Sequence, residues 1–273
     1  MSAIPLEDSA SDIVGKAQRG LKLSDEGLAR QAGVAPEALA AAKAGQADAA
    51  VLRALAAPLG LGAERLVAMA SKAYQPQPRH VAGLAQFNTV YEDMTVNSYL
   101  AWKPGQGGAV AFDTGADCGP MLEFARAQGL KIELILLTHI HTDHILDLAR
   151  LKAATGAVAR VSAVEPTPGA EPFTLPQQFA AGGLQMEARP TSGHAAGGIT
   201  YVIQGLAQPV AVVGDALFAG SMGGGMVSYA DALANNRRHI LTLPDNTVVC
   251  AGHGPLTTVG EEKLHNPFYP EFH

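Results

Sequence analysis

The sequence is short of cysteine, of long apolar runs and of positive charge. Its two cysteines, Cys118 and Cys250, are too few for a disulfide framework or for a thiolate metal cage. No stretch reaches the uninterrupted apolar length that crosses a bilayer, and the first twenty residues lack the apolar core of a signal peptide. The net charge of −6 argues against a general nucleic-acid-binding surface. These absences predict a cytoplasmic protein that does not bind membranes.

The length and the residue pattern indicate two domains. A chain of 273 residues is long for a single domain, and an apolar share of 48% is enough to fill a sizeable core. Residues 1–75 are predicted to be helical, with helices near 24–33, 37–44, 48–57 and 63–73. The Pro-containing stretch 74–79 is the predicted boundary, and residues 76–273 form the second domain. We expect the leucines of the first domain to form a small core, and a homodimer through these helices is plausible.

Residues 23–34 resemble, weakly, the helix-turn-helix of phage-repressor-like domains. Phosphate contacts normally need several Lys or Arg side chains. Residues 1–75 carry eight acidic and eight basic residues, and the segment Pro36 to Ala44 offers Lys43 as its only cation. The charge pattern therefore favours a packing or dimerisation module. A DNA-binding regulator with a metal-bound sensor domain is the alternative from a different class.

After residue 80 the pattern changes to short β-rich runs separated by single helices. Strands are predicted at 84–91, 96–102, 108–112, 133–138, 158–163, 199–204, 209–213 and 247–251, and helices at 119–128, 143–154 and 227–240. Such alternation is typical of a layered α/β architecture.

Four potential metal ligands follow the apolar strand 133–138. His139 and His141 point the same way in an extended segment, because side chains alternate with a period of two. Asp143 and His144 come next, at the start of the predicted helix. They can face a second metal position beside the one that His139 and His141 face. Imidazole and carboxylate ligands without thiolates suit zinc, and also iron or manganese.

Three further residues lie at strand ends beside glycine. His194 stands in a Gly-rich loop, Asp215 follows the strand that ends at Gly214, and His253 lies between Gly252 and Gly254. Glycine lets the backbone approach a metal closely. Together with the first four residues, all three are predicted to be ligands. His265 is interpreted as structural, and His80, His239 and His273 as surface residues.

Four segments occur in an order that resembles the motif order of the metallo-β-lactamase superfamily. They are His139 to His144, Ser192 to Gly197, Gly214 to Ser221 and Ala251 to Pro255. This order is most similar to that of the glyoxalase II branch and its short bacterial relatives. The resemblance covers residues 80 to 270 and implies an αββα sandwich after the helical domain. It also implies a dinuclear centre in which His139, His141 and His194 hold one metal, Asp143, His144 and His253 hold the other, and Asp215 bridges both.

The resemblance implies a hydrolase in which a metal-bridging hydroxide attacks a thioester or ester carbonyl of a small-molecule substrate, with two divalent ions, most simply zinc. Asp143 and Asp215 are the predicted catalytic residues. Relatives usually continue with Ile-Gly-Arg after Ser221, whereas this chain has Met222 to Met226 with three glycines between them, predicted to be a mobile loop. Loss of that Arg disfavours a glutathione thioester. A mononuclear-iron persulfide dioxygenase, with iron on His139, His194 and Asp215, and a lactonase are the alternatives.

Overall fold

The computed structural model describes residues 4–272. Any expectation for Met1 to Ala3, and the assignment of His273 to the surface, lie outside the described residues. In the described part of the chain, no helix is both long enough and apolar enough to span a membrane.

Five helices occupy the amino-terminal part of the chain. The Ser9 side chain caps the first of them, which the sequence reading did not identify, and Pro36 starts the third. The helices are α1 (Ala10–Gly20), α2 (Asp25–Ala32), α3 (Pro36–Lys43), α4 (Ala49–Leu59) and α5 (Ala63–Ala70). Lys43, the only cation of the segment Pro36 to Ala44, pairs with Asp25 at 2.6 Å.

Two six-stranded sheets follow. The first has the order β1-β2-β3-β4-β5-β6 and the second the order β12-β11-β10-β9-β8-β7. The strands of the first sheet are β1 (Leu84–Tyr91), β2 (Met94–Ala101), β3 (Gly108–Phe112), β4 (Lys131–Leu136), β5 (Val158–Ser162) and β6 (Glu171–Phe173). Those of the second are β7 (Gln177–Ala181), β8 (Leu184–Pro190), β9 (Ile199–Gln204), β10 (Val210–Gly214), β11 (Val248–Ala251) and β12 (Thr257–Thr258).

The helices that cover the sheets are α6 (Gly119–Ala127), α7 (Thr142–Ile145), α8 (Leu148–Thr155), α9 (Tyr229–Asn235), the π-helical turn η1 (Asn236–Ile240) and α10 (Val259–His265). One apolar cluster fills the space between the sheets, and another joins the first sheet to α6 and α8. The outer face of the second sheet packs on α9 and α10, which completes the expected αββα sandwich.

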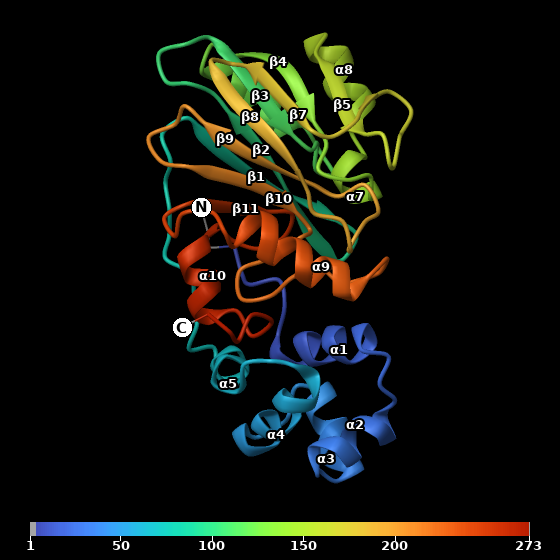
Figure 1. Cartoon of the computed structure of the whole chain (residues 1–273). Helices are drawn as coiled ribbons and strands as arrows, with labels where there is room; N and C mark the ends of the chain where they lie inside the picture. Colours follow the sequence, from blue (N-terminus) through green and yellow to red (C-terminus); the bar gives the residue numbers. More distant parts are fainter. Residues whose placement is uncertain (1–3, 273) are drawn as a thin grey trace.

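The amino-terminal helices do not have an apolar core of their own. Ile13, Leu55 and Leu66 belong to the same continuous buried cluster as Val213 of β10 and Val249 of β11. Figure 1 places α1–α5 at one end of the molecule, beside α9 and α10. The helices therefore extend the outer layer of the second sheet, and the boundary at residue 75 stays a prediction.

The structure corrects the predicted helix 143–154, which is two helices. The carbonyl oxygen of His144 accepts hydrogen bonds from the backbone N–H and the hydroxyl of Thr114, at 2.8 and 3.0 Å. The hydroxyl of Thr114 in turn accepts from the backbone N–H of Asp147. Because these bonds replace those of a continuous helix, the chain turns between α7 and α8. The predicted helix 227–240 is confirmed over 229–240, where α9 continues without a break into the π-helical turn η1.

The predicted linker differs from the expectation. Tyr74, in the predicted polar linker, is buried, and its ring stacks on His265 with the centroids 4.6 Å apart. Both cysteines are buried, Cys118 in the loop just before α6 and Cys250 in β11. Strands β6, β7, β8 and β12 and helix α10 were not predicted.

A buried carboxylate, Glu262 of α10, stands at the centre of a polar cluster near this linker. Its oxygens accept hydrogen bonds from the Tyr74 hydroxyl at 3.1 Å, the Thr257 hydroxyl at 2.8 Å, the Gly220 N–H at 3.0 Å and the Asn266 amide at 2.8 Å. Each carboxylate oxygen therefore has partners, as buried polar groups normally do.

Candidate metal centre

The segment that carries the first ligands leaves the sheet at Leu136. Strand β4 pairs with β3 and β5 up to that residue, and the backbone N–H of Thr138 donates to the Asp113 carboxylate at 2.7 Å. The Thr138 hydroxyl donates to the other oxygen of the same carboxylate at 2.7 Å. A side chain thus replaces a neighbouring strand as the hydrogen-bond partner, and the chain can direct His139 and His141 toward the site.

Asp113 also orients His144, and sequence reasoning missed it. The His144 Nδ1–H lies 2.9 Å from the same carboxylate. Asp113 has a φ of 56°, which is uncommon outside glycine and indicates that the surrounding contacts hold it there. The only signal in the sequence was an acidic residue directly after the strand that ends at Phe112.

Backbone carbonyl groups fix two further imidazoles. The Nδ1 atom of His194 lies 2.9 Å from the carbonyl oxygen of Gly224, and that of His253 lies 2.7 Å from that of Thr95. Each Nδ1 must be protonated to donate to a carbonyl, so in the neutral imidazole Nε2 carries the lone pair that can bind a metal. The Nε2 of His194 lies 3.0 Å from the Nδ1 of His141. Gly224 belongs to the predicted mobile loop, and here that loop supplies the hydrogen-bond partner of a candidate ligand.

The structure brings all seven predicted ligands together. Two sets of side chains have ligand atoms within 4.8 Å of one another, His139, His141, His194 and Asp215 in one, and Asp143, His144 and His253 in the other. A third set joins Asp113 to His139 and His144, but Asp113 is already engaged by Thr138 and His144.

Asp215 lies between the two sets. Its Oδ1 is 3.2 Å from the Nε2 of His144, and its Oδ2 is 3.3 Å from the Nε2 of His194 and 3.4 Å from that of His253. The Nε2 of His253 is also 3.4 Å from Asp143. One carboxylate thus reaches ligand atoms of both sets, which is the arrangement needed to bridge two cations.

The donor atoms at the centre fit a metal ion. The Nε2 atoms of His139 and His144 and the Oδ1 of Asp215 are buried and make no hydrogen bond of normal geometry, although the last two atoms lie 3.2 Å apart. Buried polar atoms without partners are rare and costly, so three of them at one point indicate a missing ligand. Imidazole nitrogen and carboxylate oxygen suit a borderline divalent ion such as zinc, and also iron or manganese.

Close packing around the centre requires glycine at two positions. A Cβ atom at Gly252 would lie 2.1 Å from the Oδ1 of Asp215, and one at Gly214 would lie 2.4 Å from the Thr138 hydroxyl. Gly214 also has a φ of 52°, in the region that favours glycine. The glycines beside Asp215 and His253 thus make room for the ligands.

The charges at the centre favour a cation. Burial raises the pKa of Asp215, but His144 and His253 outweigh it and hold that pKa well below its usual range. Burial lowers the pKa of His253, but Asp215 and Asp143 outweigh it and raise that pKa to about 11. Without metal, protons on the imidazoles balance the carboxylates, and a bound cation would replace these protons.

The histidines outside the predicted set lie elsewhere. His265 stacks on Tyr74, His80 is exposed, and His239 is half-buried with its carbonyl oxygen bonded to Arg189. The roles of the seven predicted ligands, and the catalytic roles of Asp143 and Asp215, stay predictions.

Comparison with known proteins identifies the family. The model of the metallo-beta-lactamase superfamily matches residues 91–253, and the chain belongs to this superfamily. The chain is 27% identical over 188 residues to a probable metallo-hydrolase of Streptococcus pyogenes serotype M6, an alignment that covers 59% of this chain and 80% of that protein. It is 36% identical over 149 residues to a hydroxyacylglutathione hydrolase of Albidiferax ferrireducens, covering 53% of this chain and 57% of that enzyme.

The solved structure of TTHA1623 in a di-iron-bound form is also similar. The two share 28% sequence identity and a TM-score of 0.57, over 67% of this chain and 99% of that one. The superfamily, the convergent His and Asp side chains and these relatives together identify a metallohydrolase.

Proposed function

We propose that this protein hydrolyses a thioester or ester bond of a small molecule at a centre that holds two divalent metal ions. The position of Asp215 between two sets of ligands carries the proposal, because a single-metal site needs only one of the sets. The relatives named hydroxyacylglutathione hydrolase support a thioester substrate.

The residues of the chain have distinct tasks in this proposal. Two bound divalent ions would supply a Lewis acid for the carbonyl oxygen and a water acidified to near-neutral pKa. Asp143, buried beside His253, is positioned to accept a hydrogen bond from the attacking water and to orient it. Asp113 and the carbonyl groups of Gly224 and Thr95 hold the imidazoles in the tautomer that binds metal.

Metal content and turnover test the proposal together. We expect about two metals per chain, mainly zinc, by elemental mass spectrometry, together with thioester cleavage by the same preparation. Asp215→Asn should lower the content towards one metal. His80→Ala, which replaces an exposed histidine away from the centre, should leave it at two.

The alternative activities give different results in this experiment. About one iron per chain, with oxygen uptake on a persulfide and no thioester cleavage, would contradict the proposal and identify a dioxygenase. Cleavage of lactones without cleavage of thioesters would retain the two-metal hydrolase and change its substrate class.

A further inference from the structure

The segment before α1 lies against the metal centre. A Cβ atom at Gly254, the residue after His253, would lie 3.3 Å from the backbone nitrogen of Glu7, 3.6 Å from its Cβ and 3.6 Å from the carbonyl oxygen of Pro5. Figure 1 shows the dark blue segment before α1 extending along the catalytic domain towards β11, away from α2–α4. Residues 4–9, which we call the amino-terminal strap, therefore border the site.

A buried charged pair anchors this strap. Asp8 accepts hydrogen bonds from the Lys16 ammonium group and the Ser221 hydroxyl. Lys16 also donates to the carbonyl oxygen of Met222 at 2.9 Å, and its nitrogen lies 4.9 Å from the centre of the Phe218 ring. Since Phe218, Ser221 and Met222 belong to the loop that follows Asp215, these contacts fix the strap to the site.

Glu7 is the residue of the amino-terminal strap that interacts electrostatically with the metal centre. Its side chain is half-buried, and its backbone packs on Gly254. Burial raises the pKa of Glu7, His253 and Lys16 lower it, and Asp8 and Asp215 raise it further. The contact with Gly254 places the Glu7 side chain beside the segment that carries His253.

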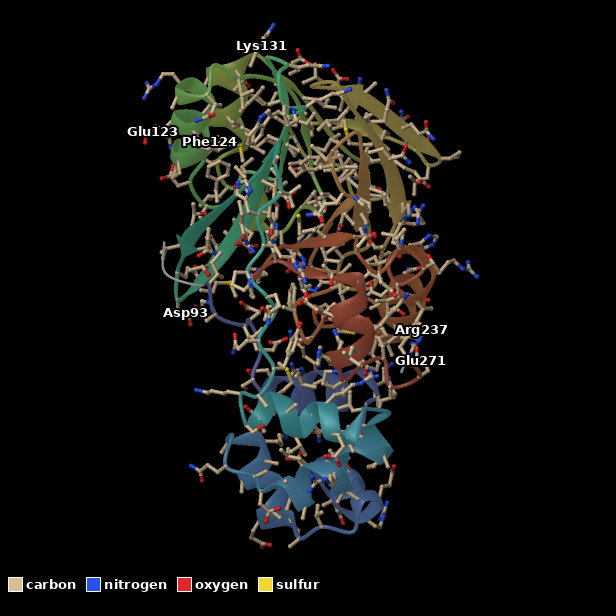
Figure 2. All side chains as sticks on the ribbon, turned by 90° about the vertical axis from the view of Figure 1, so that its left-hand side faces the viewer. Asp93, Glu123, Phe124, Lys131, Arg237 and Glu271 are labelled. Atoms are coloured by element: carbon tan, nitrogen blue, oxygen red, sulfur yellow. The ribbon has the colours of Figure 1, made fainter. Side chains whose placement is uncertain are left out.

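Among the described residues at this border, the cation that interacts with Glu7 is Lys16, which is paired with Asp8. Six segments carry the candidate ligands or contact them, namely residues 88–97, 113–118, 139–147, 191–198, 215–228 and 252–258. None of them contains Lys or Arg. The hairpin between β1 and β2 adds the exposed carboxylates Glu92 and Asp93, and Figure 2 shows Asp93 at its tip, on the edge of the catalytic domain nearest the helices. Lys16 reaches this edge, but Asp8 neutralises it.

We propose that Glu7 biases the choice of substrate by charge, so that the site prefers neutral or cationic thioesters or esters to anionic ones. This inference rests on the proposed hydrolytic function. A unit charge within about 10 Å of a ligand charge, at an effective dielectric constant of about 20 to 40, changes affinity by about fivefold to fifteenfold. The relative named hydroxyacylglutathione hydrolase acts on an anionic thioester, so this chain would differ from it in substrate.

Three thioacetates of similar size test the inference on the metal-loaded full-length protein. They are acetylthiocholine (a cation), its neutral isostere S-(3,3-dimethylbutyl) thioacetate, and the anion S-acetyl-3-mercaptopropionate. Wild-type kcat/KM should be lowest for the anion. Glu7→Gln should raise the anion-to-neutral ratio of kcat/KM about fivefold or more, and Glu7→Lys should raise it further. Glu37→Gln, an exposed position on α3, should leave the ratio unchanged.

A binding measurement separates this inference from the proposed function. Calorimetric affinities of the metal-loaded protein for 3-mercaptopropionate and for thiocholine need no turnover. If no thioester is cleaved but Glu7→Gln still strengthens binding of the anionic thiol relative to the cationic one, the hydrolase proposal fails and charge selection stands. An unchanged ratio in both measurements, a wild-type preference for the anion, or loss of metal from Glu7→Gln would overturn the inference.

Discussion

Two buried polar clusters in this molecule differ in whether their atoms have partners. Around Glu262, four donors from Tyr74, Thr257, Gly220 and Asn266 occupy both carboxylate oxygens. At the metal centre, the Nε2 atoms of His139 and His144 and the Oδ1 of Asp215 are buried and make no hydrogen bond of normal geometry. The first cluster is complete within the chain and holds the fold together. The second is complete only with a ligand, which is how a functional site differs from a structural one of similar composition.

The largest expected effect comes from changing a ligand of the incomplete cluster. Asp143→Asn and His141→Ala should each lower kcat/KM on the thioester substrate by at least about a thousandfold, because metal assistance supplies several kcal/mol of transition-state stabilisation. Circular dichroism should show the fold retained. Asp117→Asn, at an exposed carboxylate paired with Arg150, is the control and should keep nearly full activity. A ligand variant with most of the wild-type rate would contradict the assignment.

A smaller effect is expected from replacing Asp113. This residue contacts the ligand His144, but its carboxylate oxygens already accept hydrogen bonds and it is not a predicted ligand. Asp113→Asn removes the charged acceptor of the His144 Nδ1–H and of the Thr138 hydroxyl. Partners of this kind typically change metal affinity by about tenfold to a hundredfold. Competition with a chelator of known affinity measures the change. An affinity equal to that of the wild type would mean that His144 is held by its packing alone.

A change in the cluster around Glu262 should alter the free energy of unfolding and leave the metal content unchanged. Burial raises the pKa of Glu262 to about 7, even though Asn266, Thr257 and Gly220 donate to the carboxylate. A folded pKa above the unfolded value of about 4.5 means that this group stabilises the fold fully below pH 4.5 and that the contribution is lost as the pH rises through 7. The glutamine side chain of the Glu262→Gln variant does not titrate. Its amide N–H₂ group would face the donors that surround Glu262 and would not find an acceptor there.

We therefore expect Glu262→Gln to lower the free energy of unfolding by about 1 to 3 kcal/mol. Denaturant unfolding of the metal-free proteins at pH 5 and pH 8 should show a larger difference from wild type at pH 5. Glu123→Gln, at an exposed residue of α6 (Figure 2), is the matched control. A difference that grows with pH, or a loss of metal from the variant, would contradict this account.

The sequence predicted the metal centre and several strands, but not every residue of the site. The ligands follow apolar strands and stand beside glycines, so their spacing alone indicated a metal centre, and strands 84–91, 108–112 and 199–204 were predicted with their observed bounds. Strand β7 was missed because it begins with two polar residues, Gln177 and Gln178, whereas β8 was missed although its apolar and polar residues alternate from Leu184 to Arg189. Asp113 and Glu7 were missed because each acts through residues distant in the chain, and no local pattern marks such a contact.

The continuous apolar cluster shared by α1–α5 and the second sheet has a consequence for biosynthesis. The helices leave the ribosome before the second sheet, and Val213 and Val249, which share a buried cluster with Ile13 and Leu66, are made nearly 150 residues or more later. Until then, the apolar faces of these helices remain exposed to water or to chaperones. The helices α1–α5 therefore complete their packing only after the second sheet has been made, so this earlier segment becomes stable late.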